Sequence, residues 1–228
     1  MRGLLIFDKD GTLFDFEATW SVWTAGVLAE LAEGAGISAA DLGARIGFGA
    51  EGFAPDSPVI AGTLDEIVAH LLPLLPDWEA DALEEMLATR AETAPAAEVV
   101  PLRPFFEGLR AAGWKLAVMT NDVEASARAH LGGCGALDAV DLVVGADSGH
   151  GAKPDAAPLL AIARLLNERP ERAVMVGDSL HDLAAGRAAG MACVGVLTGL
   201  APRAQLAPHA DVVLASIAEL PQWLAARA

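Results

Sequence analysis

The sequence predicts an α/β fold, in which a doubly wound parallel sheet carries an α-helical cap inserted after the first strand. Two observations support this prediction. Short apolar segments of strand length alternate with helical segments along most of the chain. Between residues 16 and 97 the alternation stops and only helical patterns are recognisable. The simplest organisation is an α/β core of residues 1–15 and 98–228 and an α-helical insert of residues 16–97, referred to below as the cap.

Six apolar segments are predicted to form the sheet. They are rich in Val, Ile and Leu, and most of them end at a small or acidic residue. Strands that are apolar on both faces are typical of a parallel sheet covered by helices on both sides. The predicted strands are residues 4–7, 116–119, 142–144, 173–176, 193–197 and 212–214.

Helical segments fill the intervals between these strands. Gly113 and Gly190 stand where a glycine commonly ends a helix. In the cap, Trp20, Trp23 and Val27 recur at spacings of three and four, which places them on one helical face. The predicted helices are residues 105–112, 124–131, 158–167, 182–189 and 217–226 in the core, and 17–33, 38–45, 64–75 and 79–93 in the cap.

The composition argues against several classes of function. The chain has 31 acidic and 15 basic side chains and a net charge of −16. Binding to nucleic acid or to an anionic membrane needs clustered Lys and Arg, so neither partner is expected. The apolar runs are too short for a signal peptide or a membrane span. With Cys134 and Cys193 interpreted as reduced thiols, we expect a cytoplasmic protein. Nothing in the sequence indicates an oligomeric state.

Two carboxylates follow the first predicted strand. Asp8 and Asp10 lie two residues apart, and Gly11 would let the chain turn sharply after them. Ligands bind at the carboxyl ends of parallel strands, where one carboxylate can attack a substrate while the other transfers protons. Taken alone, the motif is explained as simply by a turn with two solvated acids.

A second acidic motif follows the fourth predicted strand. Asp178 stands at the strand end, and Asp182 falls in the first turn of the next helix. Taken alone, Ser179 is a helix cap and Asp182 a favourable charge at the helix N-terminus. Together with Asp8 and Asp10, however, Asp178 makes an oxygen-rich cluster that must bind a hard cation or suffer repulsion. Few carboxylates with open water positions suit Mg²⁺.

Two further segments carry groups that can bind an anion. Lys153 is one of only three lysines in the chain and precedes a proline and a predicted helix. A compact ammonium group at this point is one interpretation, and a solvated loop lysine is the other. Thr120 and Asn121 end the second predicted strand and offer a hydroxyl and backbone donors, although a simple turn explains them equally.

In this order, the four groups resemble the haloacid dehalogenase-like hydrolase superfamily, and within it the phosphoglycolate phosphatase-type members with a small α-helical cap. Residues 8–12 match the first motif of that family, Thr120 the second, Lys153 the third and residues 177–182 the fourth. The resemblance covers essentially the whole chain. It implies a phosphatase that uses Mg²⁺ and passes through an aspartyl-phosphate.

The resemblance also implies a role for each residue. Asp8 would attack phosphorus, and Asp10 would protonate the leaving oxygen and then activate the hydrolytic water. Asp8, Asp178 and the backbone carbonyl of Asp10 would hold Mg²⁺. Asp182 would support Lys153 or a metal-bound water, with Ser179 in the same outer shell. The groups that would bind the phosphoryl oxygens are Gly11, Thr120, Asn121 and Lys153.

The predicted substrate is a small phosphorylated metabolite, either a phosphoglycolate-like molecule or a sugar phosphate. The acid at Asp10 argues against a dehalogenase, and the absence of lysine from residues 16–97 disfavours a phosphonate hydrolase that forms a Schiff base in the cap. A sugar-phosphate mutase and a non-catalytic phosphate-binding regulator stay open. The glycine-rich segment 47–52 is predicted to be a flexible cap loop. Candidate substrate-facing cap residues are Arg45, Phe48, Phe53 and Ser57.

Overall fold

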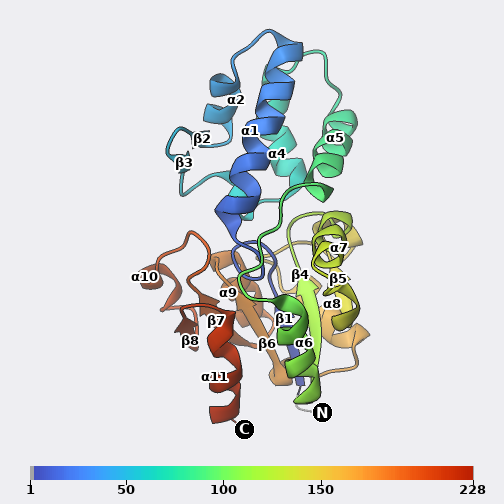
Figure 1. The fold of residues 1–228 in the computed structure, drawn as a ribbon, viewed down its shortest axis with the longest axis vertical. Coiled ribbons are helices and arrows are strands. Elements are labelled where there is room, and N and C mark those ends of the chain that lie inside the picture. The colour runs from blue at the N-terminus through green and yellow to red at the C-terminus, as the bar shows by residue number, and fades with distance from the viewer. Residues whose placement is uncertain (1–2, 228) are drawn as a thin grey trace.

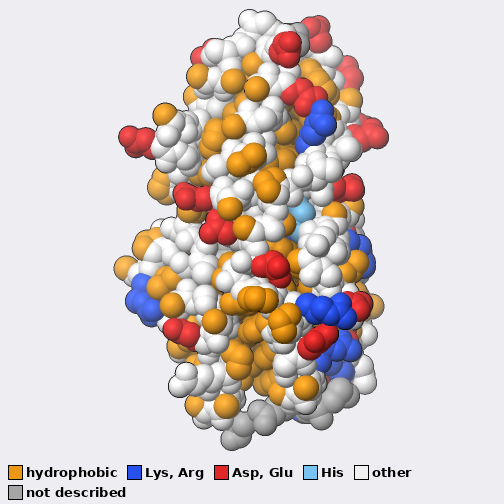
Figure 2. Space-filling model, in the orientation of Figure 1, with side chains coloured by type: hydrophobic (Ala, Val, Ile, Leu, Met, Phe, Trp, Pro, Cys, Tyr) orange, Lys and Arg blue, Asp and Glu red, His pale blue; other side chains and the backbone are white. Residues whose placement is uncertain are grey.

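The computed structural model describes residues 3–227 and has two lobes (Figure 1). The α/β core forms one lobe, and the helical cap lies over the carboxyl edge of its sheet. No helix in the described range is long and apolar enough to cross a membrane. Acidic side chains are scattered over both lobes on the face that Figure 2 shows.

A six-stranded sheet forms the centre of the core. Its order is β5-β4-β1-β6-β7-β8, and every neighbouring pair is parallel. β1 therefore lies between β4 and β6, which brings the ends of these three strands together. The fold class predicted from the alternating pattern is confirmed. The strands are β1 Gly3–Phe7, β4 Trp114–Met119, β5 Leu142–Val144, β6 Ala173–Gly177, β7 Ala192–Val196 and β8 Val212–Leu214.

Helices cover both faces of this sheet. Along β1, Leu5 and Phe7 pack with α6, α7 and α11, whereas Leu4 and Ile6 pack with α8 and α9. The side chains of a strand alternate between faces, so an all-apolar strand is buried on both sides. The core helices are α6 Leu102–Ala111, α7 Glu124–Gly133, α8 Ala157–Leu165, α9 Leu180–Ala188, α10 Arg203–Leu206 and α11 Leu220–Ala226, with 3₁₀ turns η2 Leu137–Ala139, η3 Ala146–Ser148, η4 Pro170–Arg172 and η5 Ile217–Glu219.

The cap has a hydrophobic core of its own. Trp20, Trp23 and Val27 of the first helix pack there against the other cap helices, as their spacing predicts. Asp15 caps this helix by accepting a hydrogen bond from Ala18 N (2.9 Å). The cap elements are α1 Phe16–Ala35, α2 Ala39–Arg45, β2 Phe48–Gly49, β3 Gly52–Phe53, α3 Pro58–Ala61, α4 Leu64–Leu71, η1 Leu72–Leu74 and α5 Ala80–Glu92.

Two predictions for the cap are wrong. The glycine-rich loop contains a small antiparallel hairpin, in which Phe48 of β2 pairs with Phe53 of β3 and the ring centroids are 4.8 Å apart. Strands of two residues are too short to show an alternating pattern, so the sequence reveals no strand here. The helix predicted over residues 64–75 also ends early. Pro73 has no N–H to continue the α-helical hydrogen bonds, and the chain continues as η1.

Two chain segments connect the cap to the core, and they lie side by side. Asp15 N donates to Ala97 O (2.8 Å), and Val99 N donates to Leu13 O (2.9 Å). The first segment runs from the end of β1 to the start of α1. It therefore contains the acidic motif predicted after the first strand and also connects the core to the cap. Domain boundaries at 15/16 and 97/98 stay a prediction.

Candidate active site

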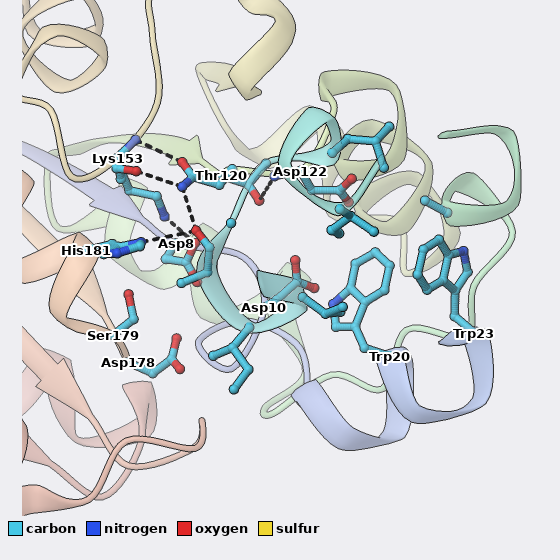
Figure 3. A pocket seen from close by; sticks show the side chains of 18 residues that line it. Asp8, Asp10, Trp20, Trp23, Thr120, Asp122, Lys153, Asp178, Ser179 and His181 are labelled. Atoms are coloured by element: carbon cyan, nitrogen blue, oxygen red, sulfur yellow. Dashed lines mark hydrogen bonds and ion pairs between the residues drawn. The ribbon is translucent and has the colours of Figure 1, made fainter. Parts of the chain in front are cut away.

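The predicted site residues come together where β4, β1 and β6 end (Figure 3). Asp8 and Asp10 follow β1, Asp178 follows β6, and Lys153 enters from the loop before α8, next to the cis peptide that joins it to Pro154. A cavity between core and cap is lined by seven of the predicted residues, namely Asp8, Asp10, Thr120, Asn121, Lys153, Asp178 and Ser179. Gly11 and Asp182 are not part of this lining.

Lys153 joins two carboxylates in the floor of the cavity. Its Nζ lies 2.5 Å from Asp8 Oδ1 and 2.6 Å from Asp182 Oδ1, and all three side chains are buried. Burial alone would lower the pKa of Lys153, but the carboxylates of Asp182 and Asp8 raise it above its usual value. Lys153 is therefore an ammonium group, and its burial between two carboxylates rules out the interpretation as a solvated loop lysine.

Asp182 combines both of its proposed roles. Its Oδ2 accepts from Ser179 Oγ (2.7 Å) and Ser179 N (3.0 Å), which closes a capping box at the start of α9. Its Oδ1 accepts from Lys153. The helix cap is thus present, and the contact with Lys153 fits the predicted support of that residue, which stays a prediction.

The turn after β1 depends on glycine. Gly11 has a φ of 79°, and a Cβ placed on it would lie 2.5 Å from Asp178 Oδ2. Thr12 Oγ1 donates to Asp178 Oδ1 (3.2 Å), and Thr198 Oγ1 donates to Gly11 O (2.6 Å). Gly11 therefore lets the β1 turn approach Asp178 closely. Its role in binding phosphate stays a prediction.

A carboxylate cluster at this turn fits a hard cation. Oxygen atoms of Asp8, Asp178 and Asp182 lie within 4.8 Å of one another. Burial and the neighbouring carboxylates raise the pKa of Asp8 to about 7, although Lys153 opposes this shift. Burial and the carboxylates of Asp8 and Asp182 raise the pKa of Asp178 as well. A divalent cation would offset this repulsion, and oxygen ligands suit Mg²⁺. Asp10 does not join this cluster through its carboxylate.

Thr120 and Asn121 make local hydrogen bonds. Asp122 N donates to Thr120 Oγ1 (3.1 Å), as the turn interpretation requires. The Asn121 side chain donates from Nδ2 to Lys153 O and accepts from Lys153 N through Oδ1 (2.8 and 2.9 Å). It also donates to Ala61 O in the cap (2.8 Å). Asn121 thus fixes the Lys153 loop and contacts the cap, while its part in phosphate binding stays a prediction.

Sequence reasoning missed four residues of the site region. Lys9, Asp122 and His130 form a buried cluster beside Asp10, and His181 contacts the cap through a hydrogen bond between Nδ1 and Ala61 O (3.1 Å). The scarcity of lysine is a signal for Lys9 as much as for Lys153. No comparable pattern marks the two histidines.

The cap wall of the cavity is apolar. Its lining from the cap consists of Trp20, Trp23, Val59, Ile60, Ala61, Gly62, Leu64, Ile67 and Ala91. None of the four cap residues proposed from sequence is among them. Phe48 and Phe53 border a separate groove at the hairpin, and buried Ser57 donates to Ile46 O (2.6 Å). The sequence could not show which face of the cap meets the core.

Comparison with known proteins decides the family. Residues 3–190 match the family model of haloacid dehalogenase-like hydrolases. The chain belongs to this family. It is 34% identical over 238 residues to a phosphoglycolate phosphatase of Rhodospirillum rubrum, covering 98% of this chain and 91% of the relative. It is also 34% identical over 197 residues to one of Cereibacter sphaeroides, covering 82% and 81%. With such relatives, this family member is a phosphatase.

Solved structures agree with the fold. A HAD phosphatase from Thermococcus onnurineus superposes with a TM-score of 0.69 at 25% identity, covering 97% of each chain. A HAD family hydrolase from Deinococcus radiodurans, solved with bound phosphate and sodium, gives a TM-score of 0.65 at 24% identity, covering 98% of this chain and 95% of that one. The two-lobed arrangement is thus a known architecture of this family.

Proposed function

We propose that this phosphatase hydrolyses small phosphomonoesters with Mg²⁺, through an aspartyl-phosphate formed on Asp8. The observation that carries the proposal is that Lys153 donates hydrogen bonds to both Asp8 and Asp182. These bonds fix one oxygen of Asp8, which follows β1 and lines the cavity. The other oxygen, Oδ2, has no hydrogen-bond partner within residues 3–227. An oriented carboxylate with one unengaged oxygen is suited to nucleophilic attack.

Each step then has a group to perform it. Asp8 forms a bond to phosphorus while the bond to the leaving oxygen breaks, and Asp10 gives that oxygen a proton. Asp10 next takes a proton from the water that attacks the aspartyl-phosphate, which releases phosphate and restores Asp8. Lys153, the Thr120 hydroxyl and the backbone amides near Gly11 and Asn121 bind the phosphoryl oxygens.

The metal would be held by Asp8, Asp178 and the backbone carbonyl of Asp10. When bound, Mg²⁺ supplies positive charge to the phosphoryl oxygens, which is the main requirement of phosphoryl transfer. In this proposal Asp182 keeps its hydrogen bonds with Lys153 and Ser179 and does not bind the metal. It supports the metal ligands from the outer shell.

The cavity favours a substrate with an uncharged organic group. Lys153 is the only Lys or Arg in its described lining, and the cap side is apolar. A substrate carboxylate would be desolvated there without a cation to pair with it, which is costly. We therefore expect propyl phosphate to be hydrolysed with a higher kcat/KM than phosphoglycolate. A preference for phosphoglycolate in the same assay would refute this assignment and favour the substrate named for the relatives.

A metal-dependence assay tests the reaction itself. Purified enzyme should hydrolyse p-nitrophenyl phosphate with Mg²⁺, lose activity in EDTA and regain it when Mg²⁺ is added back. Asp8→Asn should lower kcat by at least about 10³-fold, because amide nitrogen and oxygen are poor nucleophiles. Asp155→Asn, an exposed carboxylate outside the proposed machinery, is the matched control. Turnover that ignores EDTA, or that survives in Asp8→Asn, would contradict the proposal.

The same preparation separates the alternatives. A sugar-phosphate mutase would convert a hexose phosphate to an isomer, whereas a phosphatase releases inorganic phosphate. A non-catalytic regulator would bind phosphate without turnover. The apolar cap wall supports the phosphatase over the sugar-phosphate mutase, because a sugar needs polar partners for its hydroxyl groups.

We also propose that the substrate is a free metabolite and that the enzyme acts in the cytoplasm. The net charge of −16 disfavours binding to nucleic acid or to an anionic lipid surface. Cys134 and Cys193 are free thiols, which agrees with a reducing compartment.

A further inference from the structure

Lys9 is a fully buried lysine between the two carboxylates of the first motif. Its Nζ lies 2.9 Å from Asp10 Oδ2, 3.0 Å from Asp122 Oδ2 and 3.2 Å from His130 Nδ1. An ammonium group has three N–H donors, so each donor has an acceptor. The Nζ also lies 5.0 Å from the ring centroid of Trp20, within cation–π distance.

These contacts fix the state of His130. Lys9 can only donate, so Nδ1 of His130 must accept and the proton of the neutral ring is on Nε2. Nε2 then donates to Ala91 O (3.0 Å). Ala91 lies in α5, the last helix of the cap, and Trp20 lies in α1, the first. The Lys9 ammonium group thus contacts the first cap helix, α1, through Trp20. It reaches the last cap helix, α5, through His130.

Asp10 depends on Lys9 for its orientation. Both of its carboxylate oxygens lie within 3.0 Å of Lys9 Nζ, and no other side chain in residues 3–227 makes a hydrogen bond to that carboxylate. Burial of a charged lysine is costly, and an apolar side chain of similar volume would often fill such a space with equal or better stability. The buried charge therefore calls for an explanation other than packing.

We propose that Lys9 is a positioning residue that holds the Asp10 carboxylate for proton transfer to the leaving group and connects that position to the cap through Trp20 and the His130–Ala91 hydrogen bond. This inference rests on the proposed function, in which Asp10 is the general acid. Asp122 completes the arrangement. Its Oδ2 also accepts from Ser126 Oγ (2.6 Å), which keeps the second acceptor of Lys9 in place.

The dependence of rate on the leaving group tests this role. An alkoxide must be protonated as it leaves, whereas p-nitrophenolate leaves readily without a proton. The ratio kcat/KM reports the steps up to formation of the aspartyl-phosphate, so later use of Asp10 as a base does not enter it. In Lys9→Met, we expect kcat/KM to fall by about 10²-fold for an alkyl phosphate, the usual range for a lost general acid, and by less than about threefold for p-nitrophenyl phosphate.

A double-mutant cycle isolates the partner. If Lys9 acts through Asp10, then Lys9→Met should cost little more activity toward an alkyl phosphate once Asp10→Asn is present. Lys115→Met is the matched control, because Lys115 contacts the Leu166 carbonyl, which is remote from the site. This variant should leave kcat/KM unchanged for both substrates. His130→Gln should show the leaving-group pattern of Lys9→Met with a smaller amplitude.

Equal losses of kcat/KM for the two substrates would show a merely structural role and overturn the proposal. Since Lys9→Met leaves two partly buried carboxylates without their cation, Lys9→Met/Asp122→Asn is a second variant with one fewer unpaired charge. Circular dichroism checks the folds of both variants. Failure of both to fold would also identify Lys9 as structural. A wild-type enzyme without Mg²⁺-dependent turnover would instead contradict the proposed function.

Discussion

Asp182 uses its two carboxylate oxygens for two different purposes. One oxygen caps α9 through Ser179 and the other accepts from Lys153, so the carboxylate couples the start of a helix to Lys153. Residue by residue, the sequence could predict which acids follow strand ends, because strand ends are recognisable. It could not predict that one side chain serves two partners, since both interpretations fit the same spacing.

Two variants separate these purposes in a urea unfolding experiment. Ser179→Ala removes only the cap hydrogen bonds of the Ser179 hydroxyl group and should lower the free energy of unfolding by about 1 kcal/mol. Asp182→Ala also removes a buried charged hydrogen bond from Lys153 and should cost about 2 kcal/mol more than that. If the two variants were equally stable, the Lys153 contact would contribute nothing to stability.

His130 gives the fold a sensitivity to acid. Burial, and secondarily the Lys9 ammonium group, lower its pKa below 6.5, despite the opposing carboxylates of Asp10 and Asp122. The unfolded chain therefore binds a proton at this position that the folded protein does not. This site therefore contributes a loss of stability as the pH drops below about 6.5, where an unfolded histidine gains its proton, and the raised pKa of Asp8 contributes in the opposite direction.

Urea midpoints measured between pH 5 and 7 test this sign. From pH 7 to pH 5 the wild type should lose stability relative to His130→Gln, because that variant cannot bind the proton and keeps the other titrating groups. An unchanged slope would mean that other groups account for the acid sensitivity.

At the scale of elements, the cap meets the core through α3. The carbonyl of Ala61 at the end of this short helix accepts hydrogen bonds from Asn121 Nδ2 (2.8 Å) and His181 Nδ1 (3.1 Å). Both donors follow core strands that carry predicted motifs. The residues after β4 and β6 thus build the site and hold the cap over it.

Loss of one of these hydrogen bonds should weaken cap closure. A hydrogen bond of this kind contributes about 1 kcal/mol, so His181→Ala should lower kcat/KM by about fivefold. His70→Ala, an exposed histidine on α4, is the matched control. If the two variants were equally active, the contact between His181 and Ala61 would have no part in turnover.

The elements themselves were largely predictable, for physical reasons. Buried parallel strands leave apolar runs that even a single sequence reveals, and β1, β4 and β6 lie where those runs predict. The hairpin of Phe48 and Phe53 was not predictable, because its stability comes from an aromatic pair across two very short strands. The orientation of the cap depends on contacts such as that of Ala61, which no local pattern encodes.

For the whole molecule, charge is distributed differently on the surface and in the site. The chain carries a net charge of −16, and acidic groups are scattered over the face in Figure 2. In the site, Lys153 pairs with the buried Asp8 and Asp182, and Lys9 pairs with the partly buried Asp10 and Asp122. The excess of carboxylates over lysines in the site favours binding of a divalent cation. Such a cation would make the cavity attractive to a phosphate dianion despite the acidity of the protein.

The identity of the nucleophile is the central claim, and trapping the phosphoenzyme tests it most directly. Enzyme mixed with a ³²P-labelled phosphomonoester and Mg²⁺, quenched in acid and digested, should yield one labelled peptide containing Asp8. The label should be lost at alkaline pH, as an acyl phosphate is, and absent from Asp8→Asn. A label on any other residue, or rapid Mg²⁺-dependent turnover that persists in Asp8→Asn, would contradict the account.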